Sequence, residues 1–157
     1  RTAKFINKRF NNKLSESLHE KEIIQKFISK SSLVADAYEK REYSKAIKEI
    51  MILADQANQY IDRMEPWTLD REDSNKELVH SICTTSLNLF RLLTIMLSPV
   101  FPQLSAKIYK FLCIKPPLWE EMEMLLTDKL ISTYEPLLTR IDANKIDEIK
   151  EKSKEGL

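Results

Sequence analysis

Hydrophobic and polar positions alternate at helical spacing along most of the chain. Three stretches in which apolar side chains recur every three or four residues are predicted to be amphipathic helices: 1–16, 20–42 and 44–65. The stretch 75–98 is apolar on most sides, which predicts a central helix buried by its neighbours. A helix is also expected from Pro102, because proline suits a first helical turn, and another over 143–154, whereas 127–140 shows no clear period. The pattern favours an all-α bundle of five to six helices.

Composition narrows the class of protein further. Gly156 is the single glycine among 157 residues, so neither a glycine-rich phosphate loop nor a dinucleotide-binding fingerprint can be present. Glycine-turned β-hairpins are equally disfavoured, which supports the all-α expectation. Apolar residues make up 43% of the chain and charged residues 31%, which is typical of one soluble globular domain over residues 1–157.

The chain shows no pattern typical of catalysis, metal binding or membrane insertion. His19 and His80 have no partner at catalytic spacing. The two cysteines, Cys83 and Cys113, form no CxxC pair and are expected to be buried thiols. The apolar run 87–97 is too short to span a membrane and is interrupted by polar residues. We therefore expect no catalytic residue and no metal or cofactor in this domain, and a binding or structural role.

Two features of the predicted surface favour binding to a nucleic acid. Residues 1–13 hold five basic side chains and no acid, and Lys4 and Lys8 fall on the helix face opposite the apolar one. In the stretch ANQYIDRMEPW, Pro66 ends the third predicted helix and Trp67 follows at once. An aromatic ring can stack on an unpaired base while lysines or arginines hold phosphates. Two simpler interpretations stay open: Trp67 packs back to close the end of the bundle, and the basic residues form a solvated helix face.

Five stretches of the chain resemble the anticodon-binding domain of bacterial methionyl-tRNA synthetase: FINKRF (5–10), REYSKAIKEIMILADQANQYID (41–62), PW (66–67), NLFRLLTIMLSPVFP (88–102) and TRID (139–142). Their order and spacing match over nearly the whole chain, and the element AN.Y.D...PW is the most specific. Related synthetases for valine, isoleucine and leucine share the helical-bundle fold but not this sequence. The resemblance implies a module that recognises the CAU anticodon of a methionine tRNA.

The resemblance also implies roles for individual residues. Trp67 matches the tryptophan that stacks on the first anticodon base, and Pro66 matches the proline that helps to set the loop. Asp62 matches an aspartate beside the anticodon pocket, where a carboxylate can accept a hydrogen bond from the N4 amino group of cytosine. Asp62 could instead hold an arginine in position, either Arg1 or the adjacent Arg63.

Basic residues complete the implied tRNA site. Arg1 and Arg140 match arginines that help to recognise the anticodon, through base edges or phosphates. Lys4 and Lys8 are expected to hold the phosphate backbone. The family pattern also has an asparagine one turn before Arg1, which this sequence does not contain. We therefore expect a piece with these ends to bind its tRNA imperfectly.

The catalytic half of the family is absent from the sequence. Neither of its nucleotide-binding signatures, HIGH and KMSKS, occurs, nor does its zinc-binding insertion. The first residues, RTAKF, also lack an initiating methionine, so we expect a piece of a larger cytoplasmic synthetase whose partners are tRNA and the catalytic domain of the same chain. That enzyme would ligate methionine to tRNA with ATP and Mg, with zinc in the catalytic half of some members, and this piece alone should be inactive. Two alternatives remain open: a helical protein-interaction or scaffold domain, and the anticodon domain of another class I synthetase.

Overall fold

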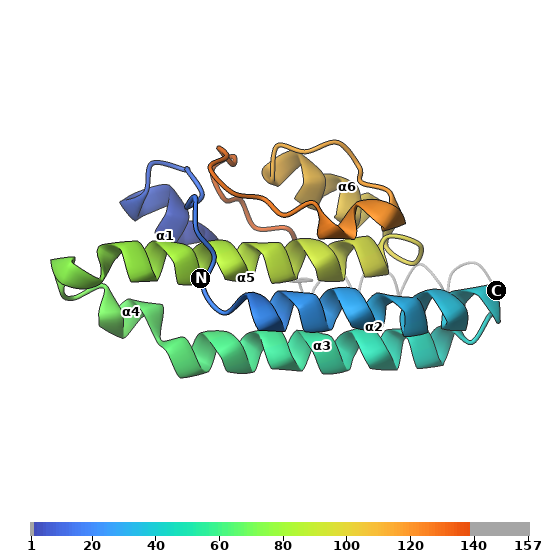
Figure 1. The fold of residues 1–157 in the computed structure, drawn as a ribbon. Helices are drawn as coiled ribbons and strands as arrows, with labels where there is room; N and C mark the ends of the chain where they lie inside the picture. The colour runs from blue at the N-terminus through green and yellow to red at the C-terminus, as the bar shows by residue number, and fades with distance from the viewer. Residues whose placement is uncertain (1, 139–157) are drawn as a thin grey trace, which may run out of the picture.

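The chain folds into a bundle of helices in the computed structural model, which describes residues 2–138. Six α-helices and two 3₁₀ helices follow one another in this range: α1 (Thr2–Arg9), α2 (Lys21–Glu39), α3 (Tyr43–Met64), α4 (Pro66–Leu69), η1 (Asp73–Asn75), α5 (Lys76–Leu97), α6 (Pro102–Phe111) and η2 (Trp119–Glu123). The long helices α2, α3 and α5 run side by side, and α1 and α6 lie against the other side of α5 (Figure 1). Within 2–138 the one extended pairing is an isolated bridge between Lys13 and Leu130. The predicted all-α bundle is confirmed.

The long helix α5 is the centre of the fold. One of its faces packs with α2 and α3 around a buried cluster that includes Phe27, Ile50 and Leu92. Another face packs with α1 and α6 around a second cluster that includes Ile6 and Ile108. Because α5 has neighbours on both sides, apolar residues on nearly all of its faces are removed from water. This explains why its sequence is the most apolar of the chain.

The hydropathy of α5 requires one correction to the sequence analysis. The helical stretch Asp73–Leu97 is long and apolar enough to cross a membrane, judged by length and composition alone. The expectation that no stretch is long enough considered only the run 87–97 and was wrong on this point. However, 78% of the most apolar window of this stretch is buried inside the protein. That burial is typical of a core helix, and it accounts for the hydropathy without a membrane.

Two buried polar side chains of α5 hold η2 and the segment that follows it. The Asn88 side-chain amide donates a hydrogen bond to the carbonyl oxygen of Leu126 (2.9 Å) and accepts one from the Leu126 amide (2.7 Å). The Arg91 guanidinium donates to the carbonyl oxygens of Met122 (3.2 Å) and Glu121 (2.8 Å). These polar residues interrupt the apolar pattern because buried backbone groups outside regular helices need hydrogen-bond partners.

The first helix ends earlier than the sequence predicts. It stops at Arg9, and Asn11 and Asn12 follow with φ of 49° and 64°. These angles lie in the left-handed region, which asparagine tolerates better than most residues. Leu14 is buried, as its spacing predicts, but through pairing of its strand-like segment with residues 129–131 and not as part of a helix face. The apolar residue Leu14 is therefore spaced as if it belonged to the first helix, but it is buried by a contact outside any helix.

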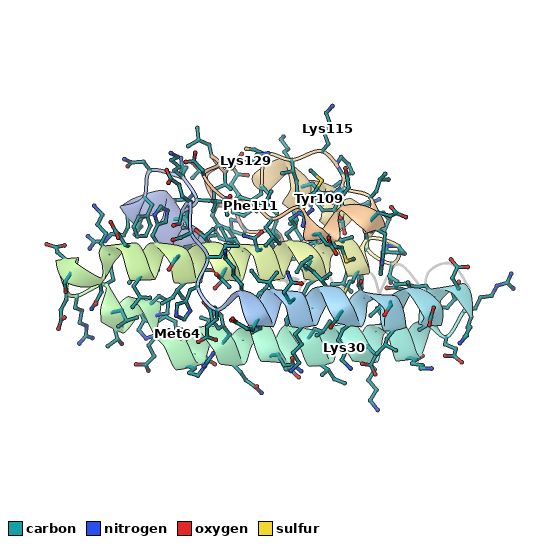
Figure 2. All side chains as sticks on the ribbon, viewed as in Figure 1. Lys30, Met64, Tyr109, Phe111, Lys115 and Lys129 are labelled. Atoms are coloured by element: carbon teal, nitrogen blue, oxygen red, sulfur yellow. The ribbon has the colours of Figure 1, made fainter. Side chains whose placement is uncertain are left out.

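The two cysteines lie in different environments, so the expectation that both are buried is wrong for one of them. Cys83 is buried in α5, and burial raises the pKa of its thiol to about 12. Cys113 is exposed and has a φ of 54°, because it follows the end of α6, where the chain leaves the bundle. Figure 2 shows Lys115 pointing away from the bundle just after this turn, whereas Tyr109 and Phe111 in α6 are buried.

We expect a water-soluble aromatic disulfide reagent to modify Cys113 and not Cys83 in the folded protein. The thiolate is the reactive form, and a buried thiol of raised pKa forms little of it at about pH 8. Thiol counting should give one fast-reacting group in the native protein and two after denaturation. Cys113→Ser should remove the fast phase and Cys83→Ser should leave it intact; a fast phase that persists in Cys113→Ser would contradict the assignment.

Candidate nucleic-acid interface

A tight turn between α3 and α4 places Trp67. Glu65 adopts a left-handed conformation (φ 41°, ψ 55°), and its amide closes α3 by donating to the carbonyl oxygen of Ile61 (3.0 Å). Pro66 excludes helical geometry at the preceding residue, as predicted, but it also begins the new helix α4, because its fixed φ suits a first helical position. The amide of Asp70 closes α4 on the carbonyl oxygen of Pro66 (3.0 Å). Trp67 therefore lies inside a short helical turn and not in an open loop.

A groove of about 520 Å³ lies between α1 and α4. It is lined by side chains from two stretches that are far apart in the sequence: Lys4, Phe5, Lys8, Arg9, Trp67 and Asp70. Trp67 is partly buried, so protein covers one part of the residue while another part borders the groove. The sequence left two alternatives for Trp67: packing at the end of the bundle, and availability to a ligand. Its partial burial beside the groove is compatible with both.

The groove carries an excess of positive charge. Three of its six lining residues are basic and one is acidic. Lys4 and Lys8 are both exposed, as predicted from their place on the outer face of α1. The ammonium group of Lys4 lies 5.8 Å from the centre of the Tyr134 ring, within the range of a cation–π contact. A hollow with this excess of basic side chains attracts anions such as phosphate.

An ion pair between Arg9 and Asp70 connects the two walls of the groove. Arg9 Nε donates to Asp70 Oδ1 at 2.9 Å, and Arg9 Nη2 lies 3.4 Å from the Asp70 backbone carbonyl oxygen. The Arg9 side chain is 46% exposed and the Asp70 side chain 19%. One arginine thus holds two acceptors of the residue that ends α4.

Asp62 lies on the exposed surface of α3 and is not one of the described residues that line the groove. Its neighbour Arg63 donates to a carboxylate oxygen of Glu20 at 2.5 Å, and the Arg63 guanidinium lies 5.8 Å from the centre of the Tyr60 ring. The Arg63 side chain is therefore held by Glu20, on the segment that precedes α2. The structure gives Asp62 no place in the Trp67 groove.

A second hollow, of about 490 Å³, lies among α1, α3, α5, α6 and the last described residues. Its lining is mainly apolar and includes Leu87, Phe90, Phe101 and Leu104. Among the described residues that line it there is no lysine or arginine to hold a phosphate, so this part of its surface suits another apolar protein segment better than RNA.

Comparison with known protein families decides what kind of domain this is. A family model described as the anticodon binding domain of methionyl tRNA ligase matches residues 13–154. The chain belongs to this family. It is 41% identical over its full 157 residues to the methionine–tRNA ligase of Thiobacillus denitrificans, and it covers 23% of that protein. The chain thus spans about a quarter of the length of this relative.

Solved structures share the fold of this anticodon-binding domain. The free form of Mycobacterium tuberculosis methionyl-tRNA synthetase matches with a TM-score of 0.81 over 90% of this chain and 30% of that chain. The complex of the same enzyme with methionyl-adenylate matches with a TM-score of 0.75 over 89% of this chain and 29% of that chain. The sequence identity is 14% in both cases, so these matches are evidence for the fold alone.

The predicted site residues of the anticodon-binding domain are brought together in part. Lys4, Lys8 and Trp67 share one groove although they lie far apart in the sequence. Arg1 and Arg140, which were predicted to recognise the anticodon, lie outside the described residues, and their roles stay predictions.

Sequence reasoning missed three residues of the groove: Phe5, Arg9 and Asp70. Arg9 was counted only as one of the five basic residues in 1–13 and as part of the stretch FINKRF, and Asp70 was not singled out. No local signal could have paired them, because they are 61 positions apart in the sequence.

Proposed function

We propose that this domain binds the anticodon loop of a methionine tRNA with the anticodon CAU, in the groove between α1 and α4. One observation carries the proposal: the indole of Trp67 and the exposed lysines of α1 border the same groove. Stacking on an aromatic side chain contributes about 1–3 kcal/mol per base, and basic side chains hold the phosphates on either side. A loop with unpaired, splayed bases is the form of RNA that such a groove can recognise.

The specificity for cytosine at the first position requires a polar group as well as a stacking ring. The resemblance places Asp62 beside the anticodon pocket, and we propose that its carboxylate accepts a hydrogen bond from the N4 amino group of this cytosine, from the exposed surface of α3 and not from within the Trp67 groove. The alternative role for Asp62 is to hold an arginine in position. Arg1 and Arg140 are proposed to contact base edges or phosphates. Pro66 acts indirectly, because it is buried and fixes the turn that carries Trp67.

We further propose that the chain is one part of a larger cytoplasmic methionine–tRNA ligase. Its 41% identity to such a ligase over only 23% of that protein supports this proposal. The remaining part would bind ATP, methionine and Mg, with zinc in some members, and would be the second partner of this domain. On its own, this domain is expected to supply tRNA specificity without aminoacylation activity and without a cofactor.

Fluorescence titration with an anticodon stem-loop tests the proposed function. Stacking of a base on Trp67 should quench its emission, so a CAU stem-loop should quench the protein and a GAU stem-loop should quench it less. Trp119 is the second tryptophan; it is partly buried, and its ring lies edge-on to that of Tyr38, with centroids 6.5 Å apart. The titration therefore uses a Trp119→Phe background. Equal quenching by both stem-loops would refute anticodon recognition. The absence of quenching by either stem-loop would also refute it, and this is the result expected of a protein-interaction scaffold.

Lys4→Ala should weaken the binding of every stem-loop by a similar factor, whatever its first anticodon base. A lysine that holds a phosphate contributes no base preference, but it adds about 0.7–0.9 to the slope of log affinity against log salt concentration. Affinity measured over a salt series should show this smaller slope.

The matched control for Lys4→Ala is Lys30→Ala, on α2 and remote from the groove (Figure 2). This variant should change neither affinity nor slope. A base-dependent loss in Lys4→Ala would mean that Lys4 reads the base and does not hold the backbone.

A further inference from the structure

The Trp67 turn is too short to be held in place by its own helix. α4 has four residues, and a helix of that length is not stable in isolation. At its first end the turn is anchored by buried Pro66 and by the hydrogen bond from the Glu65 amide to the carbonyl oxygen of Ile61. At its other end, Leu69 packs against both buried clusters, and the polar contact to α1 is the pair between Arg9 and Asp70. Trp67 lies between these two anchors.

The charge of Asp70 is unfavourable for a direct role in RNA binding. It is the acidic residue in a lining that otherwise carries three bases, and a carboxylate there repels phosphates. Its side chain is only 19% exposed and faces the Arg9 guanidinium. Arg9 in turn uses two of its nitrogens on Asp70, one on the side chain and one on the backbone, and this fork fixes the orientation of both groups.

We propose that Arg9 and Asp70 are positioning residues for anticodon recognition: their pair fixes α4 against α1, so that Trp67 and the lysines form the groove before RNA arrives. The inference rests on the proposed function of the groove and adds residues that determine its specificity. A preformed groove loses less conformational entropy on binding, so disruption of the pair weakens binding and loosens the choice of the first base.

The competing explanation is that Arg9 itself binds a phosphate and Asp70 merely accompanies it. The two explanations predict opposite signs for Asp70→Asn. Release of Arg9 and removal of a negative charge would strengthen RNA binding if Arg9 were a phosphate ligand. Loss of the anchor would weaken binding if the pair positions Trp67.

The experiment measures the affinity of CAU and GAU stem-loops for the full 157-residue chain and for three variants: Arg9→Gln, Asp70→Asn and the double variant. We expect each single variant to lose about fivefold in affinity for CAU, the upper range for a partly exposed ion pair. The ratio of CAU to GAU affinity should fall in both, and the double variant should be no worse than either single one. Tighter CAU binding by Asp70→Asn, or an unchanged ratio, would overturn the inference.

Two further variants separate positioning from charge and from folding. Asp73→Asn removes the same charge from the exposed η1 segment and should leave the CAU to GAU ratio unchanged. Arg9→Lys keeps the positive charge but cannot donate from two nitrogens of one planar group to Asp70. If Arg9 positions α4, this variant should have a reduced ratio of CAU to GAU affinity. If Arg9 binds a phosphate, it should have nearly wild-type affinity. Thermal unfolding checks that each variant is folded.

The same measurements distinguish the two proposals. If the wild-type chain does not prefer CAU over GAU, the proposed function itself fails and the positioning role fails with it. If the wild type prefers CAU and Trp67→Ala abolishes the preference, but Asp70→Asn retains it, only the positioning role is refuted.

Discussion

Trp67→Ala is expected to lower the affinity for a CAU stem-loop by about 5- to 150-fold, the range that corresponds to the loss of one stacked base. The groove loses its flat surface, because Trp67 is the residue of α4 that lines it together with the basic face of α1. Stem-loops with a different first anticodon base should lose much less affinity, since stacking on the Trp67 ring contributes less to their binding by the wild-type domain. Fluorescence anisotropy with labelled stem-loops measures both affinities under one salt condition.

The matched control for this prediction is the second tryptophan. Trp67→Phe keeps a smaller ring in the groove and should lose only part of the affinity, whereas Trp119→Phe changes a residue of η2 and should leave RNA binding unaltered. Small and equal losses for CAU and altered loops in Trp67→Ala would contradict the stacking role. That result would favour a scaffold function instead. The mainly apolar hollow beside α5 and α6 would then be the candidate surface for a protein partner.

Leu92→Ala is expected to lower the free energy of unfolding by about 2–5 kcal/mol, the range for removing a fully buried leucine. Leu92 has no exposed surface and belongs to the cluster between α5 and the pair α2 and α3. Because domains of this size have about 5–15 kcal/mol of stability in total, the variant loses a large part of it. Urea unfolding followed by circular dichroism gives the value.

Leu78→Ala provides the control on the same helix, because Leu78 is 38% exposed and its truncation should cost less than about 1 kcal/mol. The core clusters on the two sides of α5 share this helix, so Leu92→Ala should still unfold in a single transition. Two separate transitions, with the half around α1 and α6 unaffected, would contradict a bundle that is held together by one central helix.

The sequence alone determined the helices and the class of fold, because the spacing of apolar residues is a local property of each segment. The positions of α2, α3 and α5 and the start of α6 follow from that spacing and from prolines such as Pro66 and Pro102, although α2 ends three residues before the predicted bound. The helix expected over 143–154 lies outside the described residues. The surplus of apolar residues in α5 also marked it as the central helix. The family, too, followed from residues in a fixed order, and the family model confirms it.

Only the tertiary structure decided where α1 ends, because Asn11 and Asn12 turn the chain toward residues 129–131, and a periodic pattern does not register a partner so distant. The same holds for the exposure of Cys113 after α6. Most of all, the groove depends on packing: Trp67 meets the basic face of α1, and Arg9 pairs with Asp70, across 61 positions of sequence. Helical periodicity tells which face of each helix is buried. It does not tell which neighbour covers that face, and that choice, made by the packing around α5, is what forms the site.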